Sequence, residues 1–83
     1  MDEATAKQIA QQARSGCDVP ASYAFCSAQR RIIELAQDAT ADGPLVRDVD
    51  VWIVRFQSGV AWAELAVDEA TTAVVRVQRS RSQ

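Results

Sequence analysis

The sequence predicts an α+β fold in which two N-terminal helices pack on one face of a three-stranded antiparallel β-meander. Two observations predict it. Apolar residues recur every three or four positions in the first half of the chain, which is the period of a helix. After residue 45 the period changes to two, which is typical of half-buried strands. We expect helices over about residues 2–14 and 21–41, and strands over about 46–57, 60–67 and 73–79.

The first helix is predicted to begin at Asp2, whose carboxylate can accept a hydrogen bond from the backbone of the first turn. Its apolar face is thin, because only one large side chain, Ile9, stands among alanines. Gly16 suits the left-handed residue that follows a helix. This helix is therefore expected to depend on packing against the rest of the domain.

The second helix is predicted from Pro20, which suits a first helical turn, to the breakers Gly43 and Pro44. An apolar stripe with helical spacing indicates this helix, and it consists of Phe25, Ala28, Ile32, Leu35, Ala36 and Ala39. We expect this helix to cover the sheet together with the first one.

The strands are joined by two turn signals, and these predict the register of the sheet. A two-residue turn at Ser58-Gly59 places Gln57 opposite Val60. A five-residue second loop keeps Val75 and Val77 on the same face as Leu65. The expected core is formed by Ile9, Phe25, Ile32, Leu35, Trp52, Val54, Phe56, Leu65, Val75 and Val77.

The other face of the predicted sheet mixes apolar and charged side chains. In the expected register Glu64 lies between Ile53 and Arg76, and Arg55 can lie over the ring of Trp62. Tryptophan and arginine are enriched at the energetic centres of protein interfaces. We therefore predict a protein-binding site formed by Trp62, Arg55, Glu64, Arg76, Val60 and Ile53. The alternative is a solvated face on which arginine stems cover the apolar residues.

The residue inventory excludes several kinds of chemistry. The chain has no histidine, so it cannot form a Ser-His-Asp or Cys-His catalytic arrangement or a histidine-ligated zinc site by itself. Its two cysteines are too few for a four-thiolate site. The aspartate pairs 48/50 and 38/42 have the spacing of a cation or acid–base pair, but solvated carboxylates are the favoured interpretation. We predict no catalytic residue, no cofactor and no metal.

Composition bounds the class of protein and its partners. The 83 residues are 48% hydrophobic and 24% charged, which is typical of one small globular domain, residues 1–83. The net charge of −2 argues against a nucleic-acid partner. The apolar runs are short, so we expect no membrane span and a cytoplasmic protein. In that compartment Cys17 and Cys26 are expected as free thiols, with a local disulfide as the alternative.

The last third of the chain resembles PepSY-like domains and related small bacterial immunity-type proteins. The segments that carry the resemblance are Val51-Trp52-Ile53-Val54-Arg55-Phe56, Trp62-Ala63-Glu64-Leu65-Ala66-Val67-Asp68 and Thr71-Thr72-Ala73-Val74-Val75. The chain departs from the family's pattern at Thr72, where a glycine is expected, and brings no catalytic residue. The resemblance implies a non-catalytic module that binds or inhibits another protein.

The sequence therefore predicts a small bacterial protein-binding module that acts as an inhibitor, immunity or anti-defence protein by covering a partner's surface. Two alternatives stay open at this point. One is a structural homodimer joined through the same mixed face, because a patch with both arginine and glutamate can be self-complementary. The other is a small-ligand-binding α+β domain, or an enzyme, with a cavity between the helices and the sheet.

Overall fold

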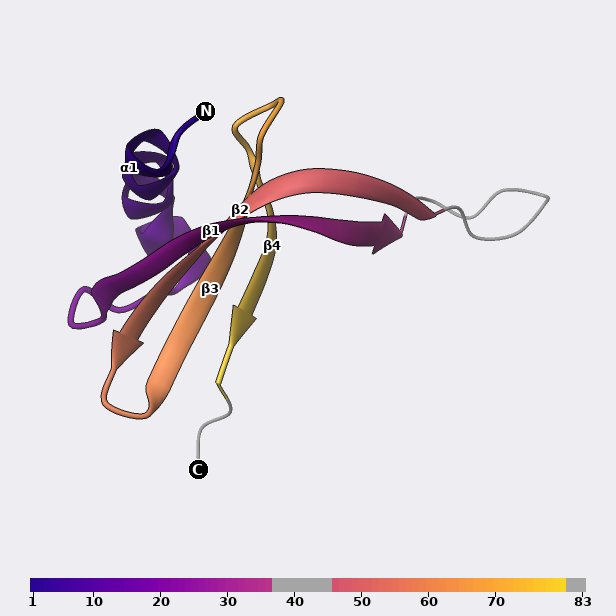
Figure 1. Ribbon diagram of the computed structural model, residues 1–83. Helices are drawn as coiled ribbons and strands as arrows, with labels where there is room; N and C mark the ends of the chain where they lie inside the picture. The colour runs from indigo at the N-terminus through magenta and orange to yellow at the C-terminus, as the bar shows by residue number, and fades with distance from the viewer. Residues whose placement is uncertain (37–45, 81–83) are drawn as a thin grey trace.

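One helix and four strands make up the described part of the chain, residues 1–36 and 46–80 of a computed structural model. Helix α1 spans Glu3–Ala13 and continues into a 3-10 turn, η1, at Arg14–Cys17. The strands are β1 (Ala24–Ala36), β2 (Val46–Ser58), β3 (Ala61–Asp68) and β4 (Val74–Arg79). They form one antiparallel sheet in the order β1-β2-β3-β4, and α1 packs on one of its faces (Figure 1).

The first predicted helix is confirmed. The Asp2 side chain accepts a hydrogen bond from the backbone N–H of Thr5 at 2.8 Å, as an N-cap does. Ala6 and Ala10 face the sheet and are fully buried, with Ile9 partly buried beside them. Small side chains on this face let the helix axis approach the sheet closely, so the thin apolar stripe is sufficient for packing.

The predicted second helix is wrong where the structure describes it: residues 24–36 form strand β1, and residues 37–41 lie outside the described part. β1 pairs with β2 along its whole length. Cys26 is an extra residue in this ladder, because Phe25 pairs with Phe56 while Ser27 pairs with Arg55. The bulge leaves Phe25 and Ala28 packed against the same core at a spacing of three, which imitates a helix.

Strands β2, β3 and β4 occupy the three ranges predicted as strands, but the first turn is displaced. Ser58 pairs with Ala61, so the turn residues are Gly59 and Val60. Gly59 has a φ of 61° and Val60 does not have a positive φ, which is the pattern of a type II′ turn. The pairing therefore differs from the predicted register by two residues, and a shift of two keeps every side chain on its predicted face.

The second link contains a strained residue and leads to another bulge. Thr72 has a φ of 62°, a left-handed conformation that a β-branched residue seldom adopts. Val67 pairs with Val74, but Ala66 pairs with Arg76, so Val75 is the extra residue. Val75 consequently packs in a different cluster from Val77, which corrects the prediction that both lie on the core face.

Two apolar clusters lie on opposite faces of the sheet. The main cluster joins α1 to β2 and β3 and contains the fully buried Val54, Phe56, Leu65 and Val67. The second cluster contains Val49, Val51 and Ala66 with Ile33, Leu35, Ile53 and Val75 beside them. Ile32, predicted in the core, is 70% exposed. In Figure 1 the ends of β1 and β2 next to residues 37–45 extend sideways as a two-stranded arm.

Arg14 fastens the end of the helix to the start of β1. Its guanidinium donates hydrogen bonds to the carbonyl oxygens of Pro20 and Tyr23 and lies 4.4 Å from the centre of the Phe56 ring. Phe56 also meets Phe25 edge to face, with 6.4 Å between ring centres. This arrangement ties the connector between η1 and β1 to the middle of the core. No helix in the described residues is long and apolar enough to cross a membrane.

Candidate functional site

We call the face of the sheet opposite α1 the open face. It carries a depression. Its cavity measures about 430 Å³ and receives residues from all four strands, including Arg31 of β1, Ile53 and Arg55 of β2, Glu64 of β3 and Arg76 of β4. The alternation of the strands places these side chains there, because residues two apart share a face. Four of the six residues predicted as a binding site therefore meet in one concave surface.

Arg55 contacts several neighbouring side chains on the open face. Its guanidinium lies 3.2 Å from a carboxylate oxygen of Glu64 and 4.7 Å from the centre of the Trp62 ring. Its Nε also donates to the side-chain oxygen of Gln57 at 3.3 Å. The Arg55 and Glu64 side chains are only 30% and 25% exposed. The predicted contact of Arg55 with Trp62 is confirmed, and the ring and the carboxylate hold the guanidinium in one position.

Strand register explains which charges pair and which do not. Arg55 stands directly opposite Glu64, whereas the predicted register placed Ile53 there. Arg76 stands opposite Ala66, so the predicted pairing of Arg76 with Glu64 is wrong. In the described part of the chain, no ion pair within 4.0 Å includes Arg76 or Arg31. These two guanidinium groups face the depression with their charges uncompensated at that distance.

Arg31 is a site residue that the sequence analysis missed. It was assigned to a helix, where it would have belonged to a solvated surface, but β1 places it in the depression. Its guanidinium donates a hydrogen bond to the side chain of Gln29 at 2.7 Å. With Arg31 the depression holds three arginines and one glutamate, so it is positive in a chain with a net charge of −2.

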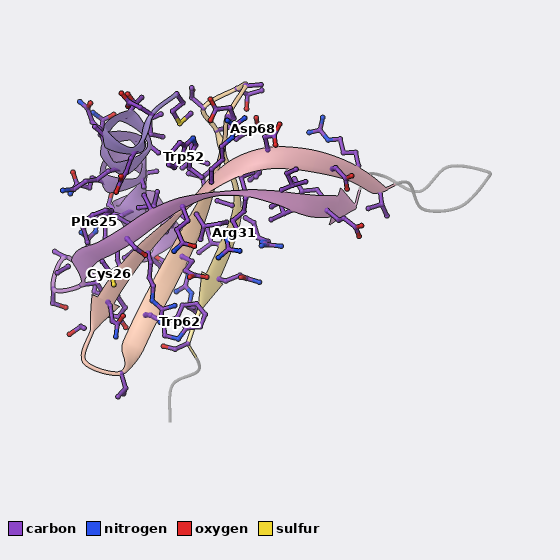
Figure 2. The ribbon with its side chains drawn as sticks, viewed as in Figure 1. Phe25, Cys26, Arg31, Trp52, Trp62 and Asp68 are labelled. Atoms are coloured by element: carbon purple, nitrogen blue, oxygen red, sulfur yellow. The ribbon has the colours of Figure 1, made fainter. Side chains whose placement is uncertain are left out.

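The remaining predicted residues differ in their exposure. Trp62 is half-buried, and it lies toward the β2–β3 turn while Arg31 lies nearer the arm (Figure 2). Val60 is 95% exposed because it is a turn residue, and it does not line the depression. Ile53 is half-buried and packs on the second cluster. The open face thus has an apolar floor beneath its charges.

Other acidic groups have structural roles. The Asp68 carboxylate accepts hydrogen bonds from the backbone of Ala70 at 2.8 Å and of Thr71 at 3.3 Å, and the first of these bonds holds the pKa of Asp68 below its usual value. Glu69 accepts from the N-terminal ammonium group at 2.7 Å and from the Trp52 indole, which lowers the pKa of Glu69 in the same way. Both carboxylates stabilise the link between β3 and β4.

No ligand set for a metal is found in the part of the chain that the structure describes. Asp48 and Asp50 project from the same face of β2, while Asp38 and Asp42 lie outside the described residues. Cys17 and Cys26 are free thiols, so the alternative of a local disulfide is wrong. Comparison with protein-family models, curated proteins and solved structures found no match. The resemblance to PepSY-like domains stays a prediction, and the functional argument rests on the open face.

Proposed function

We propose that the chain is a small, non-catalytic protein-binding module whose open face covers an acidic surface of its partner. The observation that carries the proposal is the composition of the open face. Its depression contains three arginines and one glutamate over an apolar floor, and one of these arginines, Arg55, lies over the ring of the half-buried Trp62. A purely solvated antiparallel face would be more polar than this. Tryptophan and arginine together are typical of residues that contribute most to binding energy.

The ion pairs indicate which role each arginine of the open face has in binding. Arg55 is already held by Glu64, so it orders the site at little further entropic cost when a partner binds. Arg31 and Arg76 lack a carboxylate within 4.0 Å among the described residues, so they are suited to accept one from a partner. Trp62 supplies apolar contact beside Arg55, toward the β2–β3 turn. Complementary charge of this kind sets orientation and the rate of association.

The charge of the open face favours an acidic partner over a second copy of the chain at this surface. Two copies joined face to face would bring Arg31 and Arg76 of one against the same residues of the other, and like charges across an interface oppose binding. A small-ligand site between helix and sheet has less support, because the fully buried side chains of Phe56, Leu65 and Val54 occupy that space.

We further propose that the module acts in the bacterial cytoplasm as an inhibitor, immunity or anti-defence protein. Two free thiols, one of them exposed, are stable in a reducing compartment. The PepSY-like resemblance implies the same kind of role. Occlusion requires only a rigid complementary surface, and the sheet provides one without any reactive group.

The test compares partners captured from a lysate of the source organism by the wild-type protein and by three variants. Trp62→Ala and Arg76→Glu alter the open face, and Lys7→Glu is a charge-matched control on α1, on the other side of the sheet. We expect an acidic protein that the wild type and Lys7→Glu retain and the other two lose. With that protein purified, Trp62→Ala should weaken binding about 30-fold or more, as for a residue at the centre of an interface. Equal binding by all four proteins would refute the site.

A further inference from the structure

Strand β1 is 13 residues long and forms one edge of the described sheet. The direction of its backbone groups can be derived from a single bond. The N–H of Glu69 donates to the carbonyl oxygen of Asp50 at 3.0 Å, so the Asp50 backbone points toward β3 and away from β1. Ile32 pairs with Asp50, and in such a pair both residues direct their N–H and C=O groups away from each other. The backbone of Ile32 therefore points outward from the sheet.

Alternation along the strand extends this result to Arg30 and Glu34, which are two residues before and after Ile32. All three direct backbone donors and acceptors outward, and their side chains share one face. Ile32 is 70% exposed although it lies in the middle of a strand. Natural proteins usually protect such edges with proline, bulges or charged side chains. The charges on the Ile32 side of this edge, Arg30 and Glu34, have opposite signs, so they do not repel a second copy in every register. This stretch of β1 contains no proline, and its only bulge is at Cys26, nearer the start of the strand.

We propose that two copies of the chain pair through β1, antiparallel about a two-fold axis at Ile32, so that their sheets join into one. In this register Ile32 of one copy lies opposite Ile32 of the second, and Arg30 lies opposite Glu34 of the second copy. The two exposed isoleucines bury each other, and each oppositely charged pair occurs twice because the axis repeats it. A shallow depression lined by Arg30, Arg31, Ile32 and Asp50 already marks this edge.

The charges within one chain support this register. Glu34 lies directly opposite Asp48 on β2, and like charges in that position destabilise a sheet. Among the described residues of β1, only Arg30 forms an ion pair, and its partner is Asp50 of β2 at 4.0 Å. A second copy would place its own Arg30 beside Glu34 and relieve the repulsion. The edge is therefore complementary to itself, and a second copy is the occupant that its charge pattern fits.

Helix α1 lies away from the segment of β1 that would pair. Pairing about Ile32 overlaps residues 28–36 of the two strands, whereas α1 contacts the sheet near Phe25, where Lys7 lies 4.4 Å from its ring centre. The two helices are then separated by the paired segment. Strand alternation places the side chains of Arg31 and Ile33 on the opposite side of β1 from Ile32, so the interface and the open face lie mainly on different sides of the strand. Arg31 and Ile32 border the depressions on both sides.

The test is sedimentation of the full chain over a concentration series, with charge-reversed variants. The wild type should be a dimer, and both Arg30→Glu and Glu34→Arg should weaken it about tenfold or more, because each replaces two attractive pairs with two repulsive ones. An equimolar mixture of the two variants should form a heterodimer, since Glu faces Arg at both positions. Lys7→Glu, which changes the net charge as Arg30→Glu does but lies on α1 outside the paired segment, should dimerise like the wild type.

Two results would overturn the proposal. A wild-type protein that stays monomeric at the highest concentration shows that the edge is not self-complementary. If the single variants dimerise as tightly as the wild type, any dimer uses another surface. The same follows if the mixture does not form the heterodimer while both variants unfold like the wild type. Neither result bears on the open face, which is tested by Trp62→Ala and Arg76→Glu.

Discussion

The pair formed by Arg55 and Glu64 should have an interaction energy that a double-mutant cycle can measure. In this cycle each residue is replaced by alanine, singly and together. A second cycle makes the same replacements at Glu64 and Arg76. The structure places Arg55 opposite Glu64 and Arg76 two residues away from that position. The two cycles therefore test the register of the sheet as well as the energy of one ion pair.

The magnitude follows from the geometry of the pair. At 3.2 Å two unit charges attract by about 1.3 kcal/mol in a medium like water. Ordering of two long side chains offsets part of this, and measured cross-strand pairs contribute about 0.2–1 kcal/mol. We expect a coupling of about 0.5–1 kcal/mol for Arg55 with Glu64 and close to zero for Arg76 with Glu64. Arg55→Ala should lower the free energy of unfolding by about 0.5–1 kcal/mol more than Glu64→Ala does, because Arg55→Ala also removes the contact with Trp62.

The assay is urea unfolding of the wild type and the single and double variants, with the free energy of unfolding taken from the midpoint and slope of each curve. The coupling of Arg55 with Glu64 should fall as salt is added, since both side chains are partly exposed. A coupling of Arg76 with Glu64 that equals or exceeds that of Arg55 with Glu64 would refute the register and the assignment of Arg76 as available to a partner.

Three further predictions concern the stability of the fold. Thr72→Gly should raise the free energy of unfolding by about 0.5–1 kcal/mol, because glycine adopts the positive φ without strain, and a lower thermal midpoint would contradict this. Arg14→Met should lower the free energy of chemical unfolding by about 2 kcal/mol, because the variant retains apolar contact with Phe56 but loses two charged hydrogen bonds. A variant as stable as the wild type would show that those bonds contribute nothing. The lowered pKa of Asp68 stabilises the folded state above its unfolded pKa, so stability should fall as the pH drops below about 4. Asp68→Asn should make the loss of stability below that pH shallower, and an unchanged slope would exclude Asp68 as a source of the pH dependence.

Helix α1 and strands β2 to β4 could be predicted because local chemistry and packing agree there. Asp2 caps the helix, and alternating apolar residues mark each of the three strands. β1 could not be predicted in this way. Its bulge at Cys26 breaks the two-residue alternation, and alanines around Ile32 favour a helix locally. The long ladder with β2 overrides that preference, and no pattern within residues 24–36 alone reveals its partner.

The open face was partly predictable for a geometric reason. The predicted turn was one position early, and this changed the β2–β3 pairing by two residues, which leaves each side chain on the same face. Arg55, Trp62 and Glu64 were therefore assigned to the correct face but with incorrect cross-strand partners. Arg31 was missed, because its place in the depression depends on β1. Val75 was misplaced for a similar reason, since a bulge changes the face of the residues around it.

The two proposed surfaces support each other structurally. A two-fold axis at Ile32 that is perpendicular to the sheet places both helices on one side and both open faces on the other. The dimer would then present two identical basic depressions in one direction, with Arg31 of each copy close to the axis. A partner with two acidic patches, or a dimeric partner, would bind both at once and gain affinity without any new contact. Glu34→Arg separates these effects, because it weakens the dimer and leaves every residue of the open face unchanged. If the open face binds a bivalent partner, this variant should lose the added affinity and keep the affinity of a single site.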